Sequence, residues 1–214
     1  MTTIIWDWNG TLLNDLDLCI SSINTLLEKR NLPLLNHDSY KEVFSFPVKD
    51  YYRAIGFDFS KEDFSVPARE FIDLYDSQVK NSPLHPSAKK VLRHFGERGH
   101  KQFVLSAMKQ TMLEQTLKEK EIFSFFEDVA GLNDHYATSK IERGHELLSR
   151  NKIDQQKTWM IGDTDHDYEV ASALGSRCIL VSDGHQSEKR LKRTGAKVIS
   201  KLSDLLQPEK IKVH

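Results

Sequence analysis

The sequence predicts an α/β protein with a parallel, Rossmann-like sheet and an inserted α-helical cap. Short apolar runs alternate along the chain with segments of helical periodicity, which is the pattern of parallel strands joined by crossover helices. These runs are continuously apolar, as expected for strands that are covered on both faces. Residues 14–82 interrupt the alternation and contain only helical patterns. Such an interruption indicates a second, inserted domain.

The first apolar run covers Ile4 to Trp8, and Asp7 interrupts it just before a Gly10-Thr11 loop. A buried charge is costly unless a cation or hydrogen bonds satisfy it. Open α/β sheets bind their ligands at the carboxyl ends of the strands. Asp7 is therefore the first candidate for chemistry. An aspartate that caps the following loop explains this stretch about equally well.

The inserted segment is expected to form a small helical bundle that packs its own aromatic core. Its helices are predicted over residues 16–30, 39–44, 48–55 and 67–79. Asp15 is the expected N-cap of the first of these helices, and Pro33 follows the end of the same helix. We therefore assign residues 1–13 and 83–214 to the core and residues 14–82 to the cap.

The rest of the chain supplies the remaining strands and helices of the core. Strands are predicted over residues 102–106, 125–132, 158–163 and 178–181, with an edge strand at 198–199. Helices are predicted over residues 87–95, 111–121, 140–150, 167–174 and 187–193.

Four polar residues follow the strand ends in order: Asp7, Ser106, Lys140 and Asp163. In a parallel sheet these positions converge at one edge. Two carboxylates could hold Mg²⁺ through oxygen ligands, and a hydroxyl and an ammonium could bind phosphate oxygens. A carboxylate nucleophile can form an aspartyl-phosphate. Each residue alone has a simple structural explanation, but four in this order are hard to explain as coincidence.

Four motifs carry a resemblance to a known family. They are Asp7-Trp8-Asn9-Gly10-Thr11, Val104-Leu105-Ser106, Ser139-Lys140 and Gly162-Asp163-Thr164-Asp165-His166-Asp167. With these motifs the chain resembles the haloacid dehalogenase superfamily, in the subgroup that includes phosphoglycolate phosphatase and β-phosphoglucomutase. The family patterns are Asp-x-Asp-Gly-Thr, a Ser or Thr after an apolar strand, a Lys that opens a helix, and Gly-Asp-x-x-x-Asp. The helical insert lies where that subgroup carries its cap domain.

The resemblance implies a nucleophile and a metal site. Asp7 would attack phosphorus and also ligate Mg²⁺. The backbone carbonyl of Asn9 would be a second ligand and Asp163 a third. Asp167 would either ligate the ion or orient the other ligands.

The resemblance also implies a phosphate site and an activity. Ser106 and Lys140 would bind the phosphoryl oxygens, Lys140 would offset the charge of Asp7, and Thr11 would help to cradle the transferring group. The expected activity is a Mg²⁺-dependent phosphatase that acts on a small phosphorylated metabolite, such as a phosphoglycolate-like monoester. The cap would close over the site and exclude water.

One departure from the family pattern matters, because Asn9 stands where the family has its second aspartate. In the family that aspartate protonates the leaving group and then activates water, and an amide can do neither. The loss of general acid–base catalysis typically lowers the rate about 10²–10⁴-fold. Three outcomes follow: a slow phosphatase, an enzyme with its acid/base elsewhere, or a binder of a phosphorylated ligand or partner. A phosphomutase ranks lower, because it needs the acid/base even more.

Substitutes for the missing acid/base are few. Three histidines are considered, with His185 ranked first, although a structural role fits each of them better: His85, His166 and His185. His166 lies between acidic residues and is expected to be solvated. Three basic residues of the cap could meet an anionic leaving group, although solvated helix faces explain them better: Lys41, Lys49 and Arg53.

The overall composition narrows the class of protein. The chain has 30 Lys and Arg against 31 Asp and Glu, for a net charge of −1, so no overall field favours nucleic acid or an anionic membrane. Cys19 and Cys178 match no metal spacing and are expected to be buried free thiols. With no apparent signal peptide or membrane span, we expect a cytoplasmic monomer or homodimer.

Overall fold

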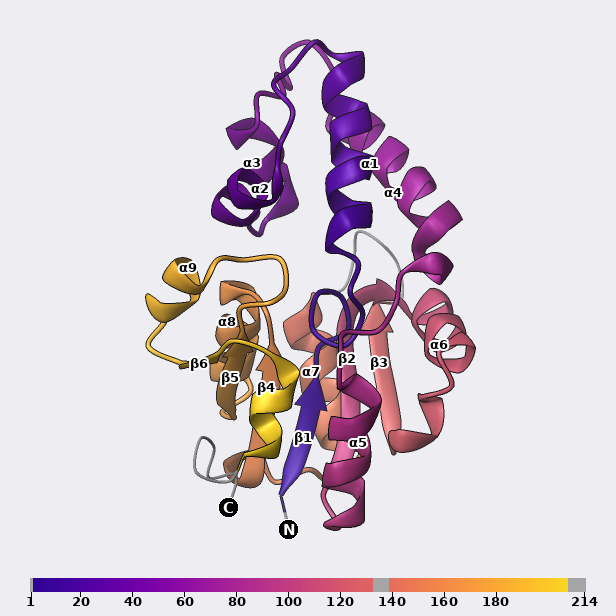
Figure 1. Cartoon of the computed structure of the whole chain (residues 1–214), viewed down its shortest axis with the longest axis vertical. Helices are drawn as coiled ribbons and strands as arrows, with labels where there is room; N and C mark the ends of the chain where they lie inside the picture. Colours follow the sequence, from indigo (N-terminus) through magenta and orange to yellow (C-terminus); the bar gives the residue numbers. More distant parts are fainter. Residues whose placement is uncertain (1, 133–138, 208–214) are drawn as a thin grey trace.

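The core of the protein is a six-stranded sheet with the strand order β3-β2-β1-β4-β5-β6. The computed structural model describes residues 2–132 and 139–207. The strands are β1 (Thr3–Trp6), β2 (Lys101–Lys109), β3 (Asp128–Leu132), β4 (Thr158–Gly162), β5 (Arg177–Val181) and β6 (Lys197–Ile199). Every neighbouring pair is parallel, so the predicted fold class is confirmed (Figure 1).

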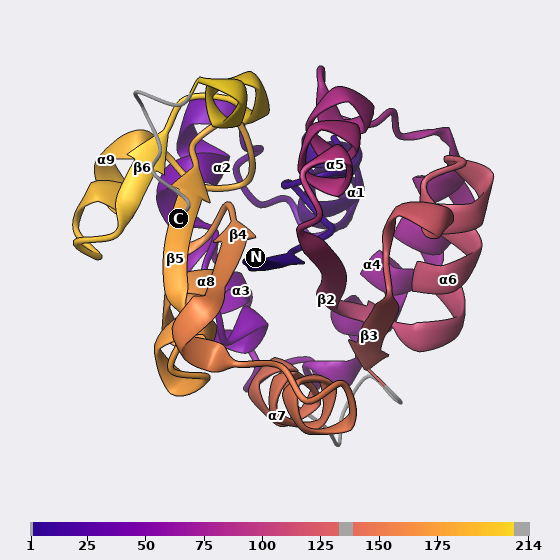
Figure 2. The ribbon, with the colours of Figure 1, turned by 90° about the horizontal axis from the view of Figure 1, so that it is seen from below.

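Helices cover both faces of this sheet (Figure 2). One face packs against α5 (Ala88–Glu97), α6 (Gln110–Glu119) and the 3₁₀ helix η4 (Leu202–Leu206). The other face packs against α7 (Lys140–Arg150), α8 (Asp165–Ala173) and α9 (Glu188–Lys192). In β1 the side chains of Ile4 and Trp6 face the first group, and Ile5 faces the second. This alternation explains why the strand is apolar throughout, since neither face meets water.

The inserted segment lies beyond the carboxyl ends of the strands, toward which β1 points (Figure 1). Its elements are α1 (Leu16–Lys29), α2 (His37–Val43), α3 (Val48–Ala54), α4 (Ser65–Gln78) and the 3₁₀ helix η1 (Val79–Asn81). The helices α1 and α4 pack against each other. Tyr52 contacts the rings of Phe57 and Phe64, with centroids 4.9 and 5.6 Å away. We refer to residues 14–82 as the cap.

Two predicted strands have different bounds in the structure. β2 continues to Lys109 rather than ending at Ser106, because pairing with β3 shifts register after Leu105 and resumes at Lys109. β3 begins at Asp128 rather than at residue 125, because residues 123–125 form the 3₁₀ helix η2 (Phe123–Phe125). The remaining short element is the 3₁₀ helix η3 (Gln155–Lys157).

Two further features bear on the predictions. Cys19 and Cys178 are both free and buried, as expected. Within residues 2–132 and 139–207, every helix is too short or too polar to span a bilayer.

Candidate active site

The loop after β1 turns sharply and brings polar groups to the edge of the sheet. The carbonyl oxygen of Trp8 accepts hydrogen bonds from the backbone amides of Thr11, Leu12 and Leu13 at 3.3, 3.0 and 2.9 Å. Gly10 has a φ of +71°, and a Cβ at this position would collide with the carboxylate of Asp163. Glycine is required here both for the backbone conformation and for this close approach.

Lys140 joins two of the predicted aspartates. Its Nζ donates hydrogen bonds of 2.6 Å to Oδ1 of Asp7 and 2.6 Å to Oδ1 of Asp167. Lys140 is the first residue of α7, and a capping box formed by Ser139 and Glu142 fixes the start of that helix. Because Ser139 and Glu142 fix the first turn of α7, they also fix the direction of the Lys140 ammonium group.

The charges in this cluster shift one another's pKa values. Burial raises the pKa of Asp7 well above its usual range, Lys140 opposes this shift, and the charges of Asp167 and Asp163 add to it. Burial would lower the pKa of Lys140, but the charges of Asp167 and Asp7 raise it. Lys140 therefore pairs with two of the three buried carboxylates, and a further cation nearby would favour the ionised form of each carboxyl group.

Thr11 links the first and fourth motifs. Its Oγ1 lies 2.9 Å from Oδ1 of Asp163 and 3.4 Å from Oδ2 of Asp7. The other oxygen of Asp163 accepts a 2.7 Å hydrogen bond from the backbone amide of His185. Burial raises the pKa of Asp163 to about 6 despite the opposing charge of His185.

The residues of this cluster fit a hard divalent cation. Ligand oxygens of Asp7, Asp163 and Asp167 lie within 4.8 Å of one another. Asp167 is already saturated, because its Oδ2 accepts hydrogen bonds from the amides of Asp163 and Thr164 and from the Thr164 hydroxyl, at 2.8–3.1 Å. Oxygen ligands suit Mg²⁺. Asp7 and Asp163 are the better-placed ligands, and the hydrogen bonds of Asp167 suit an orienting role.

Ser106 lies inside β2 at the register shift, and not after the strand as expected. Its Oγ accepts a 3.0 Å hydrogen bond from the backbone amide of Met108 and lies 3.4 Å from Oδ1 of Asn9. The irregularity in β2 thus directs the hydroxyl toward the loop after β1. All four polar positions that were predicted to converge, Asp7, Ser106, Lys140 and Asp163, are buried at this edge of the sheet.

Asn9 belongs to a network that sequence reasoning missed. Its Nδ2 donates to Oδ2 of Asp15 at 2.9 Å and lies 2.6 Å from the hydroxyl of Tyr75. Asp15 also accepts hydrogen bonds from the backbone amide of Gly10 at 2.8 Å and from Tyr75 at 2.6 Å, and it lies 3.2 Å from Nε2 of His185. Asp15 occupies the N-cap position of α1, as predicted, but its carboxylate makes no capping hydrogen bond to that helix.

The ion pair between Asp15 and His185 is buried, and each partner shifts the pKa of the other. Burial alone would raise the pKa of Asp15, but His185 and hydrogen bonds from Tyr75 and Asn9 lower it to about 2. Burial alone would lower the pKa of His185, but the charge and hydrogen bond of Asp15 raise it to about 9. The other ring nitrogen, Nδ1, lies 3.1 Å from the hydroxyl of Tyr40 in the cap. His185 therefore links the core to the cap.

The other two candidate histidines, His85 and His166, lie in different surroundings. His85 is buried, its Nδ1 lies 3.6 Å from Asp183, and its Nε2 has no hydrogen-bond partner. His166 is not fully solvated as expected: it lines the cavity described below and packs on Phe46 with ring centroids 4.8 Å apart. Within the described residues, His166 pairs with Glu169 and His85 with Asp183, and neither pairs with Asp7.

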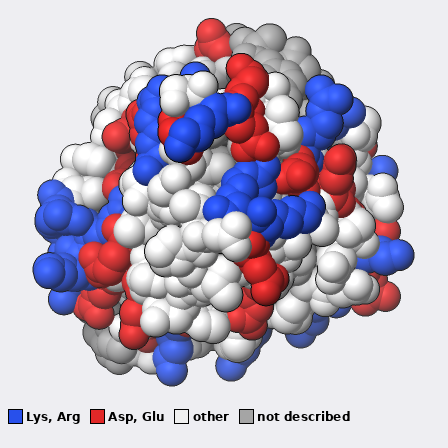
Figure 3. Space-filling view, turned by 90° about the horizontal axis from the view of Figure 1, so that it is seen from above, with Lys and Arg blue, Asp and Glu red and all other residues white. Residues whose placement is uncertain are grey.

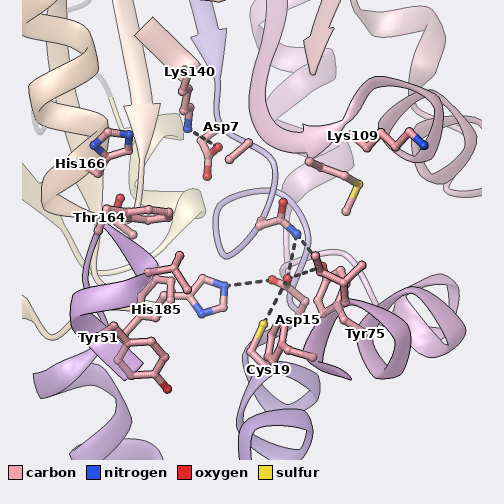
Figure 4. A pocket seen from close by; sticks show the side chains of 18 of the residues that line it. Asp7, Asp15, Cys19, Tyr51, Tyr75, Lys109, Lys140, Thr164, His166 and His185 are labelled. Atoms are coloured by element: carbon pink, nitrogen blue, oxygen red, sulfur yellow. Dashed lines mark hydrogen bonds and ion pairs between the residues drawn. The ribbon is translucent and has the colours of Figure 1, made fainter. Parts of the chain in front are cut away.

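A cavity of about 230 Å³ lies between the core and the cap. Figure 4 shows Asp7 and Lys140 meeting on one side of it, while His185, Asp15, Cys19 and Tyr75 converge on the other. The core lining includes Asp7, Asn9 and Lys140, and the cap lining is largely aromatic. The structure thus places the carboxylate of Asp7 and the ammonium group of Lys140 at a cavity beneath the helical cap.

This fold and this site define a class of α/β proteins with a reactive carboxylate after the first strand and a cap inserted directly behind it. A family model described as haloacid dehalogenase-like hydrolase matches residues 4–181. The chain belongs to this family, as its motifs led us to expect.

Individual relatives are distant. A phosphoglycolate phosphatase of Caulobacter vibrioides is 27% identical over 194 residues, which cover 87% of this chain and 81% of the relative. A tyrosine-protein kinase, PtkA, of Mycobacterium tuberculosis is 23% identical, with coverage of 92% and 67%. Among solved structures, a haloacid dehalogenase-like hydrolase of Streptococcus pneumoniae superimposes with a TM-score of 0.82 at 18% identity, with coverage of 96% and 97%. The last comparison supports the fold.

Proposed function

We propose that the protein is a Mg²⁺-dependent phosphatase of a small phosphate monoester and that Asp7 is its nucleophile. The observation that carries the proposal is the unequal environment of the two Asp7 oxygens. Oδ1 is held at 2.6 Å by Lys140, whereas Oδ2, within residues 2–132 and 139–207, has only the 3.4 Å contact with Thr11. One oxygen is thus anchored, and the other remains available to attack phosphorus at the edge of the cavity.

Asp7, Asp163 and the backbone carbonyl of Asn9 would hold Mg²⁺, with Asp167 orienting Lys140 and the start of α8. When bound, the ion would neutralise charge on the transferring phosphoryl group. The clustering of three buried carboxylates supports this assignment, because Lys140 pairs with Asp7 and Asp167 and not with Asp163.

The remaining polar residues would bind the substrate's phosphoryl group. Lys140 presents a donor beside Asp7, the Ser106 hydroxyl lies near the Asn9 amide oxygen, and Thr11 contacts both Asp7 and Asp163. Attack by Asp7 forms an oxygen–phosphorus bond while the bond from phosphorus to the ester oxygen breaks, and the leaving oxygen takes the electron pair and then a proton from solvent. Water then attacks phosphorus, breaks the bond to Asp7, releases inorganic phosphate and regenerates the carboxylate. The cap above would exclude bulk water during the first step.

Asn9 supports a second candidate function, which is the binding of a phosphorylated ligand or partner without turnover. An amide at this position supplies neither acid nor base. The names of the distant relatives, which include phosphatases and a pyrophosphatase, support the catalytic alternative. A phosphomutase ranks lower than either.

Two measurements decide between these functions. Beryllofluoride with Mg²⁺ should form a complex on Asp7 that raises the melting temperature, and Asp7→Asn should abolish both this complex and the hydrolysis of p-nitrophenyl phosphate. The matched control is Asp17→Asn, since the Asp17 side chain is 87% exposed. Hydrolysis that persists in Asp7→Asn rules out the mechanism, whereas a beryllofluoride complex without any hydrolysis favours the binding function.

A further inference from the structure

The cavity has a polar floor and an aromatic roof. The floor carries Asp7 and Lys140, and the core side also contributes Met108 and Met112. Seven aromatic residues of the cap line the roof: Tyr40, Phe44, Phe46, Tyr51, Tyr52, Phe71 and Tyr75. Aromatic and thioether side chains favour a flat apolar group between them. The roof is therefore suited to an aromatic ring and poorly suited to a hydrated ion.

The cap supplies no basic side chain to this cavity among the described residues, and its charged lining residues are Asp15 and Asp76. Lys41 lies 3.5 Å from the carbonyl of Ser182, Lys49 lies over the rings of Phe59 and Phe64, and Arg53 pairs with Asp50. Figure 3 shows basic and acidic side chains interspersed on the outer surface of the cap side. The basic lining residues beside Lys140, which are Lys109, His166 and His185, belong to the core. A carboxylate that points into the cap side of the cavity would face acidic and apolar groups.

The size of the cavity also fits a ring. An apolar cavity of about 150 Å³ is large enough to bind benzene, and this cavity measures about 230 Å³. The difference leaves room for a phosphoryl group over the polar floor.

The contacts of Asn9 identify the chemistry of the leaving group. In an in-line displacement the leaving oxygen departs on the side opposite the attacking Asp7 oxygen, which is the side of the cap. Both hydrogens of the Asn9 amide point to Asp15 and Tyr75, and the Tyr75 hydroxyl itself donates to Asp15. These groups have no spare proton for the leaving oxygen. A leaving group that departs as a stable anion does not need one.

We infer that the substrate is a phosphate monoester of an uncharged phenol, an inference that rests on the proposed phosphatase function. Asp7 forms a bond to phosphorus while the bond from phosphorus to the phenolic oxygen breaks, and the electron pair leaves with the phenolate. The phenolate takes a proton from solvent. Water then attacks phosphorus, breaks the bond to Asp7 and releases inorganic phosphate. The aromatic roof and the amide at position 9 both select for this class of ester.

The first test compares four substrates with the full chain and Mg²⁺: phenyl phosphate, cyclohexyl phosphate, phosphoglycolate and pyrophosphate. We expect kcat/KM for phenyl phosphate to exceed that for phosphoglycolate by at least about 100-fold, since a carboxylate placed against the aromatic roof would lose its hydration. Cyclohexyl phosphate should have a similar KM but a kcat lower by about 100-fold or more, since its alkoxide needs an acid. Phosphoglycolate or pyrophosphate turned over as well as phenyl phosphate would overturn the inference.

The second test needs no turnover. Benzylphosphonate and 3-phosphonopropionate keep the shapes of the phenyl and carboxymethyl esters but cannot be hydrolysed. Calorimetry with Mg²⁺ should show benzylphosphonate binding at least about tenfold more tightly, because its ring removes apolar surface from water. Equal or weaker binding would contradict the inference even if the protein hydrolyses no ester.

A pair of variants ties the preference to the roof. Val48 lines the cavity at the start of α3, whereas Val66 in α4 is 45% exposed elsewhere on the cap. Val48→Arg should reduce the preference for phenyl phosphate over phosphoglycolate by about tenfold, because a guanidinium binds carboxylates, and Val66→Arg should leave it unchanged. An unchanged preference in folded Val48→Arg would contradict the placement of the leaving group.

The results of these experiments also distinguish a failure of the phenol assignment from a failure of the proposed phosphatase function. If Asp7→Asn retains hydrolysis, the phosphatase mechanism itself fails. If beryllofluoride binds at Asp7 and the protein prefers carboxylated esters, the mechanism stands and only the phenol assignment fails.

Discussion

The side-chain amide of Asn9 donates a 2.9 Å hydrogen bond to Oδ2 of Asp15. This contact shows that the amide is part of the architecture of the site. Asp15 collects donors from Asn9, Gly10, Tyr75 and His185, so the carboxylate is fully engaged. An aspartate at position 9 would place a second carboxylate against it.

Asn9→Asp should therefore destabilise the protein, by about 1–3 kcal/mol in the free energy of unfolding, because a donor is replaced by a like charge. The double variant Asn9→Asp/Asp15→Asn should recover part of this loss by restoring one amide and one carboxylate to the pair. Urea denaturation of the four proteins in a double-mutant cycle measures the coupling. Simple additivity of the two single changes would show that the contact has no energetic weight.

The same substitution should change catalysis in a direction that depends on the leaving group. A protonated carboxyl at position 9 can donate a proton, so Asn9→Asp should accelerate hydrolysis of cyclohexyl phosphate by about 10²-fold or more. Hydrolysis of phenyl phosphate should change much less, because phenolate leaves without help. Initial rates with both esters test this, and an equal acceleration of the two would contradict the assigned role of the amide.

Lys140→Met should destabilise the metal-free protein by about 3–5 kcal/mol, because two buried carboxylates lose their cation. Mg²⁺ should restore part of this loss by binding to the aspartates. Thermal unfolding with Mg²⁺ and with EDTA measures both effects. Lys109→Met is the control, since Lys109 is exposed at the end of β2 and its replacement should change stability by less than about 0.5 kcal/mol.

The ion pair of His185 with Asp15 predicts a loss of stability at alkaline pH. The pKa of His185 is raised from its ordinary 6.5 to about 9. A raised pKa stabilises the folded protein fully below pH 6.5, and this contribution is lost as the pH rises through about 9. We expect a loss of roughly 1–3 kcal/mol over this interval, measured by urea denaturation. His185→Gln should flatten the profile there, and an unchanged slope would argue against a charged His185.

Mg²⁺ should raise the melting temperature through Asp7 and Asp163. A ligand at about 100 times its Kd stabilises the folded state by about 2.7 kcal/mol. Asp163→Asn should largely remove this effect. Asp165→Asn is a matched control two residues away, because the Asp165 carboxylate pairs with Arg190 instead. A Mg²⁺ response that survives in Asp163→Asn would place the ion elsewhere.

Most of the fold follows from local patterns. The boundaries of α7 agree with the predicted helix at both ends, because Ser139 and Glu142 form a capping box whose sequence is recognisable. The end of β2 was misplaced, because a register shift depends on how β3 pairs beside it, and that pairing is not written in the segment itself. The first half of the segment at 125–132 was misread, because a short run of aromatic residues suits a 3₁₀ turn as well as a strand.

The sequence by itself determined the parallel sheet, the inserted cap and the meeting of Asp7, Ser106, Lys140 and Asp163 at one edge. Apolar periodicity and the topology of parallel strands suffice for this, because every strand end points the same way. Only the tertiary structure decided that the carboxylate of Asp15 binds Asn9 and His185 and makes no capping hydrogen bond to α1. It also decided that Asp167 accepts several hydrogen bonds and that the cavity has an aromatic roof. These features depend on side chains from elements that are far apart in the sequence. The hydrogen bonds of Asp15 and Asp167 and the lining of the cavity form only when those elements pack together, so no single segment predicts them.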